Sequence, residues 1–416
     1  MSFTWLTAGV WFGRARARLA RPGTGVLVAA LAVELVDELV DGTKSASMPL
    51  IRHDLALSYF QLGLVSAVPL IVGGLLELPI GLVSGAGSRR RWLILGGGLA
   101  FIASLLAAGL AESFAVLLVA LTAFFPASGA FVGLSQAALM DAAPDRQAQH
   151  MAWWELAGSV GGLSGPLLAA AVLAGGGTWR LAFGLVAACG VAAWLVVARA
   201  RGLPEAAPGN ERAWPGWRAA AATVRSSGAL RWLALLEVSD LLLDVLTAFL
   251  AVYLVAAAHA SPTVAALGVA ARLGAGLAGD VIVIRLLDRF DSRRVLRASV
   301  PVALLLFPSF LLVPGVVPKL MMLAALTLAT APWYPILQAE LYGSLPGNSG
   351  LAVSLTSAAS LAGGLGPLVV GLLAQHLGIG WAMASLCVAP LLMLGGPAGN
   401  RLAAGGSAST RIGRRD

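Results

Sequence analysis

The sequence predicts an all-α integral membrane protein whose twelve transmembrane helices form two pseudo-symmetric halves of six. Three observations lead to this fold class. Of the 416 residues, 58% are hydrophobic and only 12% are charged, whereas soluble proteins carry about 25% charged residues. Apolar runs of roughly 20 residues, long enough to cross a bilayer as helices, follow one another with short polar breaks. Finally, a group of acidic residues recurs 203 positions further along the chain.

The polar breaks divide the chain into spans and connections. We place the spans at residues 24–46, 59–83, 92–111, 114–140, 151–174, 179–199, 229–257, 263–287, 298–317, 320–342, 350–374 and 378–397. The one long polar break is rich in Pro, Gly and Arg, which is typical of a connecting segment. We therefore expect an N-terminal arm (1–23), a first half (24–199), a linker (200–228), a second half (229–397) and a basic tail (398–416).

The basic residues predict the orientation of these spans. Of the 28 Lys and Arg residues, 23 fall in the arm, the linker, the tail and the loops of one side. The opposite side holds only Lys44, Arg52, Arg180 and Lys319, and Arg272 lies within a span. Because basic residues mark cytoplasmic loops, we expect both termini in the cytoplasm. The excess of Arg over Lys suggests a bacterium, and hence its inner membrane. Because the cytoplasmic loops account for the basic residues, we expect no nucleic-acid partner.

Two acidic stripes interrupt the first and seventh spans. They consist of Glu34, Asp37, Glu38 and Asp41 in span one, and of Glu237, Asp240 and Asp244 in span seven. Positions i, i+3 and i+7 share one face of a helix. A charged residue at the centre of a bilayer costs roughly 2.5–3.5 kcal/mol, so two stripes in register predict a wet cavity. A plain hydropathy scan is expected to miss span one because the stripe interrupts it.

Other features also recur between the halves. Glu77 in span two corresponds to Asp280 in span eight, again 203 positions apart. The loop 85–91 corresponds to 288–294, and both are rich in arginine. A glycine-proline pattern in span five (Gly161, Gly165, Pro166) corresponds to one in span eleven (Gly363, Gly366, Pro367). Parallel six-helix repeats with a mid-membrane site between them are a known transporter plan.

These residues resemble the major facilitator superfamily over nearly the whole chain. The family's signature loop after span two reads roughly G-x-L-x-D-x-x-G-R-R. This sequence supplies Gly81, Leu82, Gly85, Arg89 and Arg90, with glycine where the family has its acid. The second copy keeps that acid and its basic residues, as Asp288, Arg289, Arg293 and Arg294. The resemblance implies that both loops gate the cytoplasmic side of the protein. The glycine-proline pattern of span five also resembles the end of a signature found in drug exporters.

The stripes are our candidates for handling cations or protons. The full candidate set is Glu34, Asp37, Glu38, Asp41, Glu77, Glu237, Asp240, Asp244, Arg272, Asp280 and Glu340. A carboxyl group can exchange a proton for a cation as a cavity turns from one side of the membrane to the other. We therefore expect a monomeric, proton-coupled carrier in the bilayer that exports a cationic or amphipathic small molecule. We assign no cofactor and no metal site.

Some acidic residues also have structural interpretations. Glu155 follows two tryptophans and is expected at the membrane interface. Glu340 lies near the cytoplasmic end of span ten, where it can act as a gate or cap. Asp41 and Lys44 are spaced as an i, i+3 ion pair. Arg272 is expected to pair with an acid of span seven or with Asp280.

Two further functions remain open from the sequence. A divalent metal transporter of the same fold is one, because Mg²⁺ and Mn²⁺ prefer carboxylate oxygens. A Mg²⁺-dependent membrane prenyltransferase is the other, because Asp240 and Asp244 form a D-x-x-x-D pattern. That enzyme needs several basic residues at its site, and Arg272 is the one available within a span.

Overall fold

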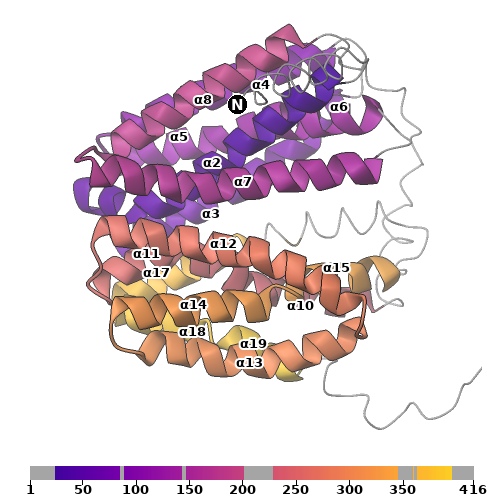
Figure 1. Cartoon of the computed structure of the whole chain (residues 1–416). Helices are drawn as coiled ribbons and strands as arrows, with labels where there is room; N and C mark the ends of the chain where they lie inside the picture. Colours follow the sequence, from indigo (N-terminus) through magenta and orange to yellow (C-terminus); the bar gives the residue numbers. More distant parts are fainter. Residues whose placement is uncertain are drawn as a thin grey trace, which may run out of the picture.

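The computed structural model describes residues 24–84, 89–142, 147–200, 228–344, 359 and 363–395, and these residues fold almost entirely into helices. The first half consists of α2 (Thr24–Asp54), α3 (Tyr59–Ser84), α4 (Arg89–Gly109), α5 (Phe114–Ser128), η1 (Gly129–Gly133), α6 (Leu134–Ala142), α7 (Gln147–Ala174) and α8 (Trp179–Arg199). Figure 1 shows these helices as one layer of the molecule, with the second half stacked beside it.

The second half repeats this arrangement. It consists of α10 (Ala229–Asp240), η3 (Leu241–Val245), α11 (Leu246–Ala256), α12 (Pro262–Leu287), α13 (Ser292–Leu312), α14 (Val316–Thr330), α15 (Trp333–Ser344), α17 (Leu365–Leu377), α18 (Ile379–Ser385) and α19 (Val388–Gly395). The predicted arm and tail, and residues 201–227 of the linker, lie outside the described residues.

The predicted set of twelve spans is confirmed. Among the described residues, nine helical stretches are long and apolar enough to cross a membrane, and two shorter apolar helices follow near the end of the chain. The remaining span is α2, which a hydropathy criterion passes over, as the acidic stripe predicts. Four of the predicted spans contain a local change of helix in their described residues: a π-helical turn interrupts the fourth (η1) and the seventh (η3), the tenth breaks between α14 and α15, and the twelfth breaks between α18 and α19.

The helix of the ninth span begins six residues before the predicted start of that span, near residue 298. The helix α13 begins at Ser292 because Asp291 caps it, accepting a hydrogen bond from the Arg294 N–H at 3.3 Å. A capping carboxylate satisfies an N–H group that the first helical turn leaves without a partner. Arg293 and Arg294 consequently lie on the first turn of a helix and not in the loop.

The two halves pack closely at one end of the molecule, and we call this contact the inter-half seal. Its small side chains let the helices touch: a Cβ on Gly63 of α3 would lie 2.8 Å from the Pro367 carbonyl oxygen, and one on Gly371 of α17 would lie 2.6 Å from the Tyr59 carbonyl oxygen. The Tyr59 N–H also donates to the Gln375 side-chain oxygen at 3.1 Å. A buried alanine cluster continues the seal between α2, α7 and α12, through Ala46, Ala169, Ala170 and Ala266.

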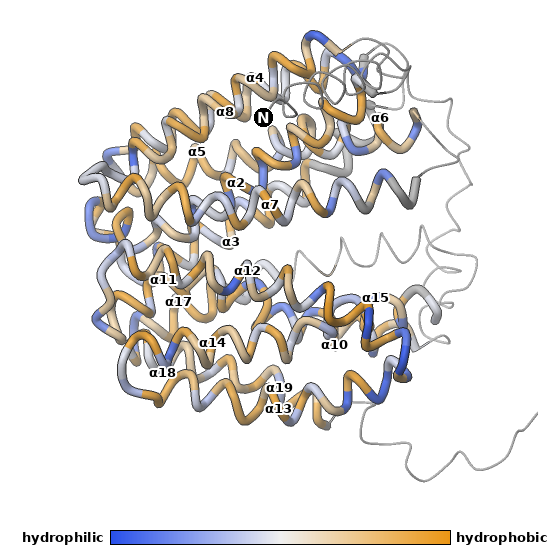
Figure 2. Tube along the Cα trace, in the orientation of Figure 1, coloured by the Kyte–Doolittle hydropathy of each residue, from blue (hydrophilic) through white to orange (hydrophobic). Residues whose placement is uncertain are grey.

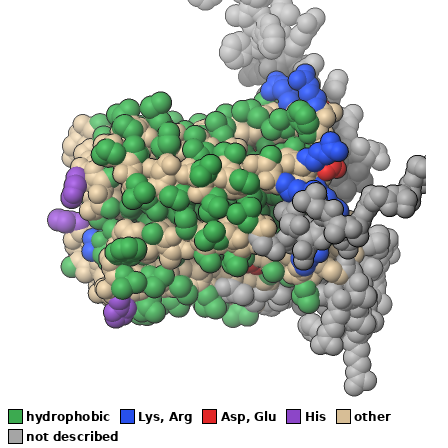
Figure 3. All heavy atoms as spheres, turned by 90° about the horizontal axis from the view of Figure 1, so that it is seen from below, with side chains coloured by type: hydrophobic (Ala, Val, Ile, Leu, Met, Phe, Trp, Pro, Cys, Tyr) green, Lys and Arg blue, Asp and Glu red, His purple; other side chains and the backbone are tan. Residues whose placement is uncertain are grey.

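Charge is distributed unevenly along the helices. Figure 2 shows apolar residues over most of the trace, with hydrophilic residues concentrated at the helix ends. Figure 3 shows most of the visible Lys and Arg side chains at one end of the face and His side chains at the other, with hydrophobic side chains between. The histidine-bearing end is the end of the inter-half seal, where Asp54, His259 and Gln375 lie near the helix termini. An apolar belt with polar ends is what a bilayer requires of a spanning protein.

Candidate binding cavity

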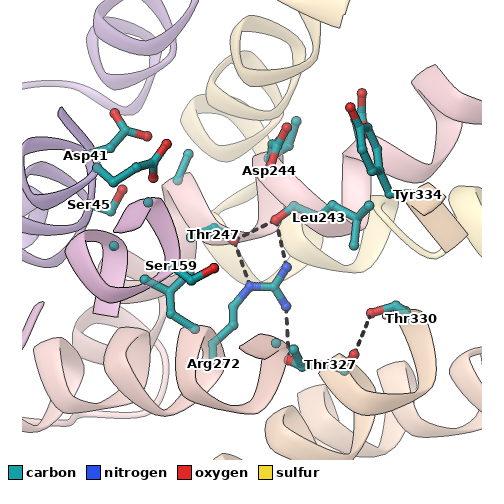
Figure 4. A pocket seen from close by; sticks show the side chains of 18 of the residues that line it. Asp41, Ser45, Ser159, Leu243, Asp244, Thr247, Arg272, Thr327, Thr330 and Tyr334 are labelled. Atoms are coloured by element: carbon teal, nitrogen blue, oxygen red, sulfur yellow. Dashed lines mark hydrogen bonds between the residues drawn. The ribbon is translucent and has the colours of Figure 1, made fainter. Parts of the chain in front are cut away.

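A cavity of about 910 Å³ lies between the two halves. In the first half it is lined mainly by α2 and α7, and in the second mainly by α10, η3, α12 and α15. Figure 4 shows part of this lining, with Asp41 and Ser45 on one side and Asp244 and Tyr334 on the other. The matched spans one and seven therefore do face a common space, as the acidic stripes predicted.

Eight acidic side chains line this cavity, and we call them the cavity carboxylates. They are Glu34, Glu38, Asp41, Glu155, Glu237, Asp240, Asp244 and Asp280. Seven of them belong to the set predicted from the sequence. Glu155 is the addition: its predicted place is the membrane interface, but it lines the cavity while the adjacent Trp154 is buried on another face of α7.

Two predicted site residues have partners away from the cavity. The Asp37 carboxylate accepts a hydrogen bond from the Ser128 hydroxyl of α5 at 2.8 Å. Glu340 accepts two hydrogen bonds from Arg293, at 2.8 and 2.7 Å, which joins α15 to α13. A third predicted residue, Glu77, has a side chain that lies outside the described part of the chain. The helical repeat alone placed Asp37 on the acidic face of span one. The packing of α2 against α5 decides which side chain is its hydrogen-bond partner.

The cavity carboxylates face two basic residues, and both already have partners. The Lys44 ammonium lies 2.5 Å from the Asp41 carboxylate, in the i, i+3 arrangement expected from the sequence. Among the described residues Arg272 forms no direct ion pair with an acid of span seven or with Asp280, although Asp244 of span seven lies within its electrostatic range. Its guanidinium donates instead to the carbonyls of Leu242 and Leu243, both at 2.7 Å, and to the hydroxyls of Thr247 and Thr327 at 2.7 and 3.2 Å.

Glycines on α7 bring its backbone against the acidic face of α2. A Cβ on Gly158 would lie 2.7 Å from a Glu34 carboxylate oxygen, and one on Gly161 only 2.2 Å from the Leu35 carbonyl oxygen. Gly165 is equally tight, because a Cβ there would lie 2.5 Å from the Leu39 carbonyl oxygen. Real Cβ atoms do not come this close to other atoms, so only glycine permits this approach of the two helices.

The second glycine-proline pattern is similarly placed. A Cβ on Gly363 would lie 2.4 Å from a Glu237 carboxylate oxygen, and one on Gly366 would lie 3.1 Å from a Val245 methyl carbon. The next residue, Pro367, takes part in the inter-half seal through its carbonyl oxygen. Both patterns therefore set how closely a helix approaches an acidic stripe, which makes them packing elements of the cavity wall.

Sequence reasoning missed most of the neutral lining. Ser45, Ser66, Ser159, Thr247, Thr327 and Thr330 add hydroxyl groups, and Phe125 and Tyr334 add aromatic rings. Of the adjacent aromatic residues in α15, Tyr334 lines the cavity, whereas Trp333 is fully buried, with its indole N–H donating to Ser299 at 2.9 Å. The hydroxyls of Thr247, Thr327 and Thr330 also donate to carbonyls one turn earlier in their own spans, and no spacing rule predicts which hydroxyls line the cavity.

One arginine of each predicted gating loop forms an ion pair within its own half. Arg90 is buried and lies 2.6 Å from Asp141, which joins α4 to α6. Its counterpart in the second half is Arg293, paired with Glu340. Gly81 lies in α3, whereas Gly85 and the side chain of Arg89 lie outside the described residues. Asp288 caps the end of α12, and Arg289 follows it in the exposed connection to α13.

The described residues do not bring a metal-binding group together. No three His, Cys, Asp or Glu side chains within them lie close enough to hold one metal ion. The cavity carboxylates are instead spread over α2, α7, α10, η3 and α12. Such a lining offers several separated acceptors to a bound molecule.

Twelve helices in two six-helix halves, with a polar cavity between the halves, define a membrane transporter built from parallel repeats. The family model of the Major Facilitator Superfamily matches residues 35–339. The chain belongs to this family, whose members are transporters. No curated protein sequence matches the chain.

Solved transporter structures share this fold at low sequence identity. A bacterial homologue of the human lysosomal transporter Spinster, in an inward-facing and occupied conformation, is 16% identical, with a TM-score of 0.76 over 90% of this chain and 96% of that one. The nucleoside transporter NupG is 13% identical, with a TM-score of 0.70 over 90% and 99%. The D-xylose–proton symporter is 15% identical, with a TM-score of 0.69 over 90% and 97%.

Proposed function

We propose that this protein is a proton-coupled carrier that exports an organic cation by alternating access. The observation that carries the proposal is the charge of the cavity. Eight carboxylates and two basic residues line it, and the basic residues are already engaged by Asp41 and by the neutral groups around Arg272. Uncompensated carboxylates in a low-dielectric space require either protons or a bound cation.

The size and neutral lining of the cavity support an organic substrate. A volume of about 910 Å³ lies in the range of roughly 300–1,000 Å³ that is common for small-molecule sites. The aromatic rings of Phe125 and Tyr334, together with Leu70 and Leu163, offer apolar contact beside the carboxylates. An aromatic face next to negative charge is favourable for an amphipathic cation.

The orientation of the helices supports loading from the cytoplasm. The inter-half seal lies at the end with few basic residues, and the arginine-rich ends of α4 and α13 lie at the other. By the positive-inside rule the arginine-rich end is cytoplasmic. The conformation is then inward-facing, the state in which an exporter takes up its substrate, and the bacterial Spinster homologue of similar fold is also inward-facing.

Proton coupling follows from competition at the carboxylates. A cation and a proton exclude one another at one carboxylate, so a cavity that opens alternately to either side exchanges the two. The exchange moves protons inward and the cation outward along a proton gradient. The D-xylose–proton symporter shares this fold, although it carries a neutral sugar.

The proposal is tested by proton flux in proteoliposomes. The purified protein is reconstituted with a pH-sensitive dye inside, and a panel of organic cations that includes tetraphenylphosphonium is compared with Mn²⁺ and D-xylose. We expect organic cations to drive proton movement, and Asp240→Asn to reduce it. Proton movement driven by Mn²⁺ alone would favour the metal transporter, and no movement with any cation would refute the proposal.

The surroundings of Arg272, Asp240 and Asp244 argue against the prenyltransferase hypothesis. Its diphosphate substrate needs basic groups, and the donors of Arg272 are bound to protein oxygens. Asp240 and Asp244 also lie on opposite sides of a change from α-helix to π-helix, which alters the D-x-x-x-D spacing on which the hypothesis depended.

A further inference from the structure

We propose that the cation site is asymmetric: Asp244, and not its pseudo-equivalent Asp41, takes the transported cation, and Arg272 is the positioning residue that holds Asp244 in the cavity. This inference rests on the proposed function and narrows it. The two aspartates occupy matching positions in spans one and seven, and both line the cavity. Their surroundings nevertheless differ in two ways, which we take in turn.

Asp41 already has a cation. Its carboxylate lies 2.5 Å from the Lys44 ammonium, one turn along the same helix, α2. Lys44 is also held near the Phe125 ring, with its ammonium 5.9 Å from the ring centroid. A substrate cation at Asp41 would have to compete with the Lys44 ammonium, which is tethered three residues away on the same helix.

Asp244 has no such partner. Its side chain is exposed in the cavity and makes no hydrogen bond or ion pair within the part of the chain that the structure describes. The basic residue within electrostatic range is Arg272, but its Nε and both terminal nitrogens donate to Thr247, Thr327, Leu242 and Leu243. Figure 4 shows the bonds from the guanidinium to Thr247, Leu243 and Thr327, while the Asp244 carboxylate points away from the guanidinium into the open space.

The four hydrogen bonds maintain the π-helical turn that carries Asp244. In η3 the N–H of Leu246 donates to the Leu241 carbonyl, so the Leu242 carbonyl loses its usual α-helical partner. A buried carbonyl without a donor is costly, and Arg272 supplies that donor at 2.7 Å. Arg272 also donates to the Leu243 carbonyl, to which the Thr247 hydroxyl donates at 2.6 Å.

The turn decides where Asp244 points. Converting one π-turn to regular α-helix changes the register by one residue, which rotates the flanking side chains by about 100° around the helix axis. Without Arg272, the turn therefore loses the bonds that favour it, and Asp244 leaves its place in the cavity. The matching helix of the first half, α2, has no such turn, because it is α-helical from Thr24 to Asp54.

Substitutions at both aspartates test the asymmetry. In proteoliposomes driven by a proton gradient, with tetraphenylphosphonium as the substrate, Asp244→Asn is expected to raise KM by about tenfold or more. Asp41→Asn is expected to stay within about twofold of the parent protein, since a neutral side chain there only frees Lys44. Equal losses in the two variants, or a larger loss in Asp41→Asn, would overturn the proposal while leaving proton-coupled export intact.

Arg272→Lys distinguishes positioning from charge compensation. A lysine keeps the positive charge, but its compact ammonium cannot bridge two carbonyls and two threonines as a guanidinium does. We expect Arg272→Lys and Arg272→Gln to raise KM similarly, whereas a pure counter-ion role predicts that lysine preserves KM. Arg285→Gln, which removes an exposed arginine from the same helix, is the matched control and is expected to leave KM unchanged.

A second measurement does not depend on transport. Carboxyl groups of the purified protein are labelled with a water-soluble carbodiimide and an amine, and the modified residues are quantified by mass spectrometry. We expect Asp244 to react several-fold faster than Asp41, and Arg272→Lys to lower the labelling of Asp244. Labelling of Asp41 at an equal or higher rate would refute the asymmetry even if no test cation is transported.

Discussion

At the scale of the residue, identical spacing in the two acidic stripes gives unequal environments. Asp37 and Asp240 are pseudo-equivalent, yet Asp37 accepts a hydrogen bond from Ser128 and Asp240 lines the cavity. The sequence pattern determines the helical face on which an aspartate lies. It does not determine which neighbouring helix covers that face, because this depends on contacts between residues far apart in the chain.

This difference predicts unequal effects of neutralisation. Asp240→Asn removes a cavity carboxylate and is expected to lower cation transport by about tenfold, since a partly desolvated charge contact is lost. Asp37→Asn keeps the size of the side chain and an oxygen that still accepts from Ser128, so its effect is expected to be about threefold or less. Initial rates of cation uptake into inverted membrane vesicles compare the two. A larger loss in Asp37→Asn would place that residue, and not Asp240, in the substrate path.

At the scale of the element, α2 and α7 form the wall on which the first-half carboxylates stand. Their close approach depends on glycine, since a Cβ on Gly161 would collide with the backbone at Leu35. The sequence correctly indicated that these glycines serve helix packing. The sequence did not indicate that the helix face against which these glycines pack is the acidic stripe of α2.

Gly161→Ala is therefore expected to destabilise the first half. The added methyl group must push α7 from α2, and overpacking of this kind costs about 1–3 kcal/mol or more. Thermal unfolding of the detergent-solubilised protein measures the loss. Gly184→Ala on α8, where a Cβ would meet nothing within 4 Å, is the control and is expected to be neutral or slightly stabilising. Equal stability of the two variants would contradict the close approach of α2 and α7.

At the scale of the whole molecule, composition and repeats predicted the fold almost completely. Hydropathy, basic loops and the 203-residue repeat specify twelve spans and two halves, because the bilayer leaves few alternatives to a helix. The lining of the cavity was predicted in part. Seven of the cavity carboxylates were identified, whereas Glu155, the threonines around Arg272 and the π-turns were not. Those features arise where helices from distant parts of the chain meet, and no local pattern specifies them.

The inter-half seal predicts how transport can be stopped. Alternating access requires α3 and α17 to separate near Tyr59 and Gln375, which are in contact in this conformation. In a variant with Cys189 and Cys387 replaced by serine, Tyr59→Cys and Gln375→Cys joined by a short, reducible bis-methanethiosulfonate reagent should stop transport. Reduction should restore it, and either single cysteine is the control. Continued transport in the cross-linked protein would show that this seal does not open.

The central claim is that protons and an organic cation compete for the cavity carboxylates. Its most direct test is proton release when the purified protein binds tetraphenylphosphonium in weakly buffered detergent solution. We predict that binding releases protons, that Asp240→Asn and Asp244→Asn reduce the number released per bound cation, and that Glu112→Gln, at an exposed site between α4 and α5, leaves it unchanged. Binding of the cation without any proton release would contradict the account.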